Sequence, residues 1–291
     1  MGAYTELLVN AIISGLLLGG IYSAIAVGIT LAFGMLDIVN IAHPAFVMLG
    51  AFVAYWLNTN WGLDPLVAML LAAPFAYLAG CGLYRTYYYC FEKRGEESLQ
   101  GLAYFFGILF IVEVGLLLVF GVDYRSVDAA YIGPVLEWGQ ISVSTRMLVP
   151  LTAGLATVIA IHSFVNRTFI GRAILAVSQD PAALRLIGVN PIKIKEIAFG
   201  LAIATAVMAG PLLIIIQPVE PSMGRDFIGR VFAICVLGGM TSLTGTVLAS
   251  MILGVSESIT ASFIGPSWGT AVSFGLLLVT LAVRPSGIFG R

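Results

Sequence analysis

The sequence has few charged residues. Of its 291 residues only 10% are charged, whereas 59% are hydrophobic, and the mean hydropathy is +1.02. A soluble domain carries about 25% charged residues, so this chain has too few polar side chains to cover a surface in water. The scarcity of charge excludes a soluble enzyme, a disordered chain and a nucleic-acid-binding protein. It indicates a polytopic membrane protein.

Cysteine and histidine are also scarce. The three cysteines, Cys81, Cys90 and Cys235, have no C-x-x-C spacing, and there are two histidines. We therefore predict buried free thiols, and neither a disulfide framework nor a metal site. No convergent nucleophile and base indicate a catalytic site, so the chain is not expected to be an enzyme. The first residues lack the positively charged start of a cleavable signal peptide.

Long apolar runs dominate the rest of the sequence. A helix that crosses a bilayer needs about 20 apolar residues, and a backbone amide left unpaired in lipid is costly, so we expect helices. Alternating β-barrel strands are absent from runs such as 115–120. We predict one all-α transmembrane domain over residues 1–291. Its nine crossings or half-crossings are Leu7–Phe33, Pro44–Leu57, Pro65–Tyr84, Leu102–Val122, Met147–Phe164, Ile197–Ile216, Phe227–Leu237, Val247–Phe263 and Trp268–Val283.

The charged residues gather in a few connections. Lys and Arg are concentrated in 85–97, in 166–196 and at the C-terminus, whereas the 123–146 connection contains three acidic residues against two arginines. Because cytoplasmic loops are enriched in Lys and Arg, this pattern predicts an external N-terminus and a cytoplasmic C-terminus. This orientation requires that each of the two short segments, 44–57 and 227–237, crosses the membrane once.

These two short segments are flanked by helix breakers. Pro44 suits the first turn of a helix, Asp226 is a predicted N-cap, and Gly238 and Gly239 form a predicted stop. Short, interrupted segments in two parts of a membrane protein are typical of a transport pathway. The alternative is that both are kinked helices packed on small residues.

Several polar residues lie at membrane depth. Glu113 and Glu257 fall inside predicted spans, where a carboxylate costs roughly 2.5–3.5 kcal/mol and should therefore face the protein interior or water. Each either lines a pathway or pairs across helices, or it is a protonated acid with an internal hydrogen bond. Asn40 and His43 lie beside Pro44, and we expect His43 to satisfy backbone groups at this break.

The segment at about 166–194 is too polar to span a membrane and too apolar for a free loop. Asp180 is placed to cap a helix that begins at Pro181 and that Gly188 terminates, and a second helix is built on 171–177. A helix of two turns is marginal alone, so its apolar face needs a partner. That partner is either a groove in a cytoplasmic protein or the lipid surface.

Five groups of residues, in order along nearly the whole chain, resemble the LivH-type permease subunit of the branched-chain amino-acid (hydrophobic amino acid uptake) ABC transporter family. The five groups are Gly28–Gly34 with Ile38–His43, the segment Gly171–Ala173 with Gln179–Asp180 and Leu186–Asn190, Ala206–Gly210, Val236–Ser242 with Gly245, and Arg284–Gly290. The last group is the family's C-terminal signature.

The resemblance implies an ABC importer permease fold (type II-like) of about eight to ten helices and half-helices. It also implies partners: a homologous second permease (LivM-type), two cytoplasmic ATPase subunits and a periplasmic substrate-binding protein. The chain itself contains no G-x-x-x-x-G-K-[ST] motif, so ATP and Mg are expected on the partners and no cofactor on this chain. A bacterial inner-membrane heterodimer that carries branched-chain or related amino acids, or similar small polar solutes, is the expected assembly.

The resemblance also implies roles for particular residues. Those expected to couple to the ATPase are Gly171, Arg172, Ala173, Asp180, Ala183, Leu186 and Gly188. By the resemblance, Asn40, His43, Gly238 and Gly239 are expected along the translocation pathway. Glu113 and Glu257 are assigned to it as well, because they are carboxylates at membrane depth.

The sequence departs from the family pattern at Pro44, Thr241 and Thr244, where the family usually has Gly, Gly and Pro. These departures bear on the substrate more than on the mechanism. A proton-coupled secondary transporter that uses Glu113 or Glu257 is the main alternative. A passive channel and a membrane enzyme are further alternatives.

Overall fold

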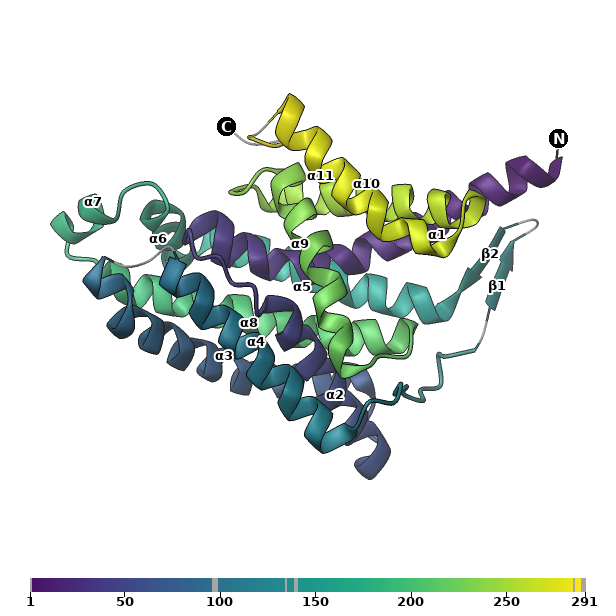
Figure 1. Ribbon diagram of the computed structural model, residues 1–291, viewed down its shortest axis with the longest axis horizontal. Coiled ribbons are helices and arrows are strands. Elements are labelled where there is room, and N and C mark those ends of the chain that lie inside the picture. The colour runs from purple at the N-terminus through teal and green to yellow at the C-terminus, as the bar shows by residue number, and fades with distance from the viewer. Residues whose placement is uncertain (1, 96–98, 134, 139–140, 285, 289–291) are drawn as a thin grey trace.

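Long helices make up most of the chain in the computed structural model, which describes residues 2–95, 99–133, 135–138, 141–284 and 286–288 (Figure 1). The α-helices are α1 (Gly2–Ile29), α2 (His43–Trp61), α3 (Pro65–Cys90), α4 (Leu99–Phe120), α5 (Thr145–Arg167), α6 (Phe169–Val177), α7 (Pro181–Leu186), α8 (Pro191–Ile216), α9 (Gly224–Gly238), α10 (Leu243–Phe263) and α11 (Gly269–Val283). Short helical turns are the π-helix η1 (Thr30–Met35) and the 3-10 helices η2 (Glu92–Arg94), η3 (Pro221–Met223) and η4 (Pro266–Trp268).

Seven helices among the described residues are long and apolar enough to cross a membrane. These seven helices correspond to α1, α3, α4, α5, α8, α10 and α11. The 19-residue α2 and the 15-residue α9 account for the two short predicted segments. All nine predicted segments are therefore helical, and the all-α prediction is confirmed. The exception is a hairpin of two antiparallel strands, β1 (Val135–Trp138) and β2 (Ile141–Ser144), which was not predicted.

Most helices begin a few residues before the predicted apolar segments, and two of these starts have a clear local cause. Asp226 lies inside the first turn of α9, after Met223 as N-cap, so its prediction as the N-cap is wrong. The 3-10 turn at Pro221–Met223 leads directly into α9, so the helix begins at Gly224, before Asp226. Helix α8 begins at Pro191 because the Asn190 side chain accepts a hydrogen bond from Ile192 N at 3.0 Å and caps it.

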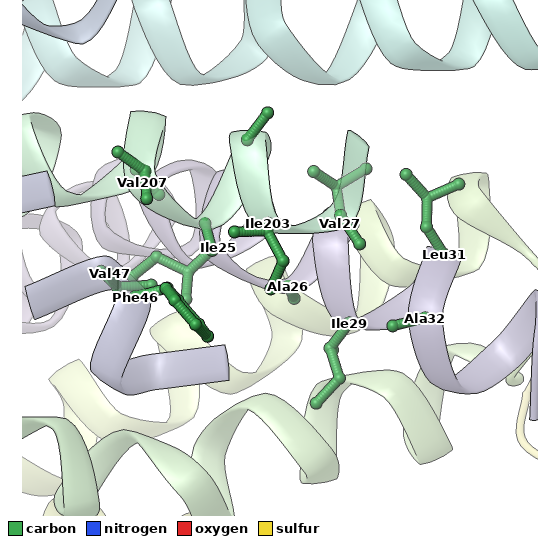
Figure 2. Packing of buried hydrophobic residues seen from close by; sticks show 14 of the residues in the cluster. Ile25, Ala26, Val27, Ile29, Leu31, Ala32, Phe46, Val47, Ile203 and Val207 are labelled. Carbon is green, nitrogen blue, oxygen red and sulfur yellow. The ribbon is translucent and has the colours of Figure 1, made fainter. Parts of the chain in front are cut away.

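Helices α1 and α8 form the centre of the molecule. In the most apolar part of each, 72% and 83% of the residues are buried, against 17–33% for the other five long helices. Figure 2 shows Ile25 and Ala26 of α1 beside Ile203 and Val207 of α8 and Phe46 of α2. The other long helices surround this centre and keep apolar faces free, as expected of helices in contact with lipid.

Small residues allow α1 to approach α10 closely. A Cβ at Gly15 would lie 2.5 Å from Val255 Cα, and one at Gly19 would lie 2.6 Å from Met251 Cα. Such contact is the usual role of a G-x-x-x-G pair in membrane helices.

The predicted capped helix in the 166–194 segment is confirmed. Asp180 Oδ1 accepts hydrogen bonds from Ala182 N at 2.8 Å and Ala183 N at 3.0 Å, so it caps α7. Gly188 has a φ of 79°, the left-handed backbone of a helix terminus. Helices α6 and α7 lie at one end of the molecule, and the N-terminus and the hairpin lie at the other (Figure 1).

Candidate functional site

The first helix break follows α1. The chain widens into the π-helix η1, turns at Asp37 with a φ of 59°, and enters α2 at His43 with Pro44 in the first turn. Short π-helical turns are frequent at functional sites. The fully buried His43 places Nε2 2.9 Å from the Ile25 carbonyl oxygen, so it contacts the backbone of the last part of α1, next to the break.

Three buried polar atoms at this break have no hydrogen-bond partner among the described residues. They are Oδ1 and Nδ2 of Asn40 and Nδ1 of His43. Both side chains have no exposed surface. A buried polar group needs a hydrogen-bond partner, so these atoms are available to bind water or a polar solute at the break.

The second break follows α9. The helix ends at Gly238, and Gly239 has a φ of 87°, so the predicted stop is confirmed. The Ser242 hydroxyl accepts a hydrogen bond from Gly245 N at 3.0 Å and caps α10. A Cβ at Gly238 would lie 2.6 Å from the Gly245 carbonyl carbon, so α9 and α10 meet through backbone at this turn.

The two breaks are in direct contact. A Cβ at Gly34 would overlap the carbonyl oxygen of Met240. The hydroxyls of Thr30 and Thr246 lie 2.8 Å apart. We call the contact between residues 30–43 and 236–246 the break junction.

The C-terminal segment packs on the same junction. Ile288 N donates a hydrogen bond of 2.8 Å to the Leu237 carbonyl. Gly287 has a φ of 80°, and a Cβ there would lie 2.5 Å from Gly239 N. Part of the predicted C-terminal signature, Pro285 and residues 289–290, lies outside the described residues.

A cavity of about 500 Å³ adjoins the break junction at the α6 end of the molecule. Its walls are Met35 of η1, residues 241–244, the end of α5 and the end of α6. Leu175 of α6 lines it, together with Ser178 and Gln179 directly after that helix. Thr241 and Thr244, two of the departures from the family pattern, also line it.

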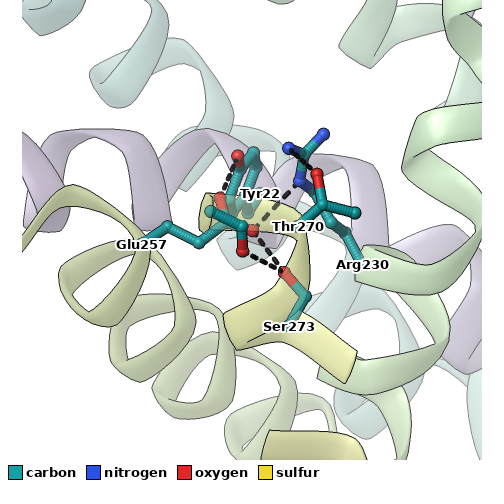
Figure 3. A network of polar contacts seen from close by, with 6 residues as sticks. Tyr22, Arg230, Glu257, Thr270 and Ser273 are labelled. Atoms are coloured by element: carbon teal, nitrogen blue, oxygen red, sulfur yellow. Dashed lines mark hydrogen bonds and ion pairs between the residues drawn. The ribbon is translucent and has the colours of Figure 1, made fainter. Parts of the chain in front are cut away.

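Both carboxylates at membrane depth are bound by arginines of α9. Glu113, 4% exposed, accepts two parallel hydrogen bonds from Arg225, Nε to Oε2 at 2.8 Å and Nη2 to Oε1 at 2.5 Å. Glu257 accepts from Tyr22 at 2.7 Å, from Arg230 Nε at 3.0 Å and from the Ser273 hydroxyl (Figure 3). Of the interpretations that the sequence left open for Glu113 and Glu257, the structure shows pairing across helices.

Sequence reasoning did not single out Arg225 or Arg230. A signal was present, because Arg230 lies inside the predicted 227–237 span, where a cation needs a partner. The guanidinium of Arg230 also donates to Thr270 at 3.3 Å and lies over the Phe227 ring. The Arg225 side chain is 52% exposed.

The predicted coupling residues divide into a buried base and an exposed tip. Gly171 and Ala173 of α6 are buried, and a Cβ at Gly171 would lie 2.5 Å from Val165 Cα of α5. Arg172, Asp180, Ala183 and Gly188 are exposed. So are Leu186, at 88%, and Ile187, at 73%. An apolar tip therefore projects from this end of the molecule.

The fold and these sites define a polytopic membrane protein with two broken helices in contact. Residues 11–281 match the model of the family described as branched-chain amino acid transport system / permease component, and the chain belongs to this family.

Curated relatives agree with this assignment. The permease protein BraD of a high-affinity branched-chain amino acid transport system, from Pseudomonas aeruginosa, is 28% identical, covering 99% of this chain and 96% of the relative. The corresponding LivH permease protein of Salmonella typhimurium is 26% identical over 96% of this chain and 94% of the relative. A chain of PsaBC from Streptococcus pneumoniae, solved in complex with Fab, aligns over 97% of this chain and 94% of that chain, with 17% identity and a TM-score of 0.49.

Proposed function

We propose that this permease carries branched-chain or related amino acids, or similar small polar solutes, across a bacterial inner membrane by alternating access. It would pair with a homologous permease of the LivM type. Two cytoplasmic ATPase subunits would bind ATP and Mg, and a periplasmic protein would deliver the solute. The family and the names of the relatives support this proposal, since LivM permeases of Salmonella typhimurium and Escherichia coli also match this chain.

The α6–α7 segment is proposed to transmit movement of the ATPases. Its exposed apolar tip at Leu186 and Ile187 suits a groove on a cytoplasmic protein. The observation that carries the proposal is the shared cavity, because α6 and residues 241–244 line the same space. A shift of α6 would therefore change the walls of a cavity that reaches the break junction.

The break junction is proposed as the moving part of the pathway. Asn40 and His43 have buried polar atoms without partners, and Gly238 and Gly239 allow a change of backbone direction. In a state with the junction open, these atoms would be available as hydrogen-bond partners for water or solute in the pathway.

Arg225 is proposed to face the pathway at the contact with the second permease. Its side chain is half exposed, and its partner Glu113 lies in the middle of α4. An exposed guanidinium at that depth is costly in lipid, so water or protein should cover this face of α4 and α9.

The α6–α7 end is proposed to be cytoplasmic. Lys93, Arg172, Arg185 and Lys193 are exposed there, whereas Asp123 and Asp128 lie in the connection at the opposite end. This distribution agrees with the positive-inside rule. On this basis we propose an external N-terminus and a cytoplasmic C-terminus.

Reconstitution with the co-purified subunits tests the proposal. We expect uptake of leucine into proteoliposomes to require ATP. The Leu186→Glu/Ile187→Glu variant should lose the ATPase subunits, whereas Tyr124→Glu, a control at an exposed position of the opposite end, should retain them. Uptake driven by a proton gradient without ATP would favour the secondary transporter instead. Solute flux through this chain alone would favour the channel.

A further inference from the structure

A cavity beside the α3–α8 contact, at the α6–α7 end of the molecule, is lined by cations and tyrosines. It has a volume of about 470 Å³ and lies where α3 and η2 meet the start of α8. Its walls include Arg85, Tyr88, Tyr89, Lys93, Ile192 and Lys193. We call these six residues the basic groove.

The charge in and beside the basic groove is not balanced. Glu196 is already bound to Arg85 at 2.8 Å, and Glu92 to Lys195 at 2.5 Å. The exposed Lys93 and Lys193 have no ion-pair partner among the described residues. Arg185 of α7 lines an adjoining cavity of about 250 Å³ together with Lys93. Among the described residues, the groove therefore has an excess of positive charge that an anion would neutralise.

An apolar track leads to the basic groove along α3. Leu71, Phe75 and Leu78 are 48%, 75% and 66% exposed. Arg85 and Tyr89 follow on the same helical face, because the spacings of 4, 3, 7 and 4 residues are each close to one or two helical turns. A soluble anion would leave this track unused, whereas a lipid would place its head group on the cations and its acyl chains on Leu78 and Phe75.

The tyrosines are placed as expected for the boundary between lipid and water. Tyr89 is 63% exposed and Tyr88 lies beside it, with ring centroids 5.3 Å apart. Tyrosine is enriched at this depth because its ring is apolar and its hydroxyl is wet. Basic pockets between helices at a membrane surface bind lipid phosphates.

We propose that the basic groove binds the head group of an anionic phospholipid. The bound lipid would fill the space between α3 and the start of α8, next to Arg185 of α7. It would therefore connect the composition of the membrane to the position of the α6–α7 segment.

Native mass spectrometry of the full chain, purified with its co-purifying subunits, tests the proposal. Phosphatidylglycerol should bind in preference to phosphatidylcholine. Lys93→Gln/Lys193→Gln should weaken phosphatidylglycerol binding about 30-fold, from roughly fivefold for each cation near a membrane surface. Lys93→Arg/Lys193→Arg keeps both charges and should retain binding, which separates loss of charge from misfolding.

A matched control removes two exposed cations elsewhere on the chain. Arg167→Gln/Arg284→Gln changes the net charge equally but leaves the basic groove intact, so it should bind phosphatidylglycerol as the parent does. An equal loss of phosphatidylglycerol binding in both double variants would overturn the proposal. It would mean that the lipid is attracted by the overall charge of the chain and not by the basic groove. Deacylated glycerophosphoglycerol bound as tightly as the whole lipid would also overturn it. So would loss of the ATPase subunits from Lys93→Gln/Lys193→Gln with unchanged lipid binding, which would assign the groove to a protein contact.

Discussion

The pair of Arg230 and Glu257 gives the most direct test of how α9 is held in place. Glu257 is 5% exposed and accepts three hydrogen bonds, of which only the one from Arg230 brings a compensating charge. We expect Arg230→Met to destabilise the chain by about 3–5 kcal/mol, because it leaves a buried carboxylate facing two neutral hydroxyls.

The double variant distinguishes loss of the pair from loss of packing. Arg230→Met/Glu257→Gln removes both charges and keeps similar volumes. It should therefore recover most of the stability that Arg230→Met loses. Asp123→Asn is the control, because Asp123 lies 3.9 Å from Arg125 with 79% of its side chain exposed. An exposed pair of this kind contributes less than about 1 kcal/mol.

The measurement is the free energy of unfolding in mixed micelles, followed by tryptophan fluorescence as a denaturing detergent is titrated. The four chains of the cycle give the coupling energy of the pair. A loss below about 1 kcal/mol for Arg230→Met, or a double variant as unstable as the sum of the two single variants, would refute the ion pair as the anchor. Normal stability together with abolished proton-driven uptake in Glu257→Gln would instead support a proton carrier.

Three further substitutions test the break junction and the coupling segment. Gly34→Ala should sharply lower the melting temperature, because its Cβ would overlap a carbonyl of the second break, whereas Gly82→Ala, in open space, should not lower it. Asp180→Ala should cost about 1 kcal/mol in α7, seen as faster hydrogen exchange there and weaker retention of the ATPase subunits. Gly287→Val should loosen the end of α9, seen as faster labelling of the buried thiol of Cys235 in the folded protein; an unchanged labelling rate would remove the C-terminal segment from the junction.

The positions of the helices could be predicted from the sequence because their causes are local. Apolar runs of sufficient length specify the spans. Pro44, Asp180 and Gly188 mark helix ends through their own backbone and side-chain chemistry, and the structure has them in those places. Asp226 failed as a cap because the 3-10 turn at Pro221–Met223 leads directly into the helix, which therefore begins at Gly224.

The composition of the candidate site could not be predicted, because its contacts join distant parts of the chain. Glu113 meets Arg225 across 112 positions, and Thr30 meets Thr246 across 216. Local patterns specify that a buried carboxylate needs a partner, but the partner depends on which helices pack together. The same holds for the shared cavity, whose walls come from four separate segments.

The two ion pairs have a consequence for the movement of α9. Arg225 and Arg230 attach its first half to two different parts of the molecule, Glu113 on α4 and Glu257 on α10. Breaking either pair leaves a buried charge, so rotation of the whole helix is opposed from both sides. The other end is different, because α9 ends at Gly238 with Gly239 directly after it, and residues 241–244, which follow in the same turn, line the cavity beside α6. Movement of the α6–α7 segment should therefore bend α9 at its Gly238–Gly239 end while the arginine-bearing half stays fixed.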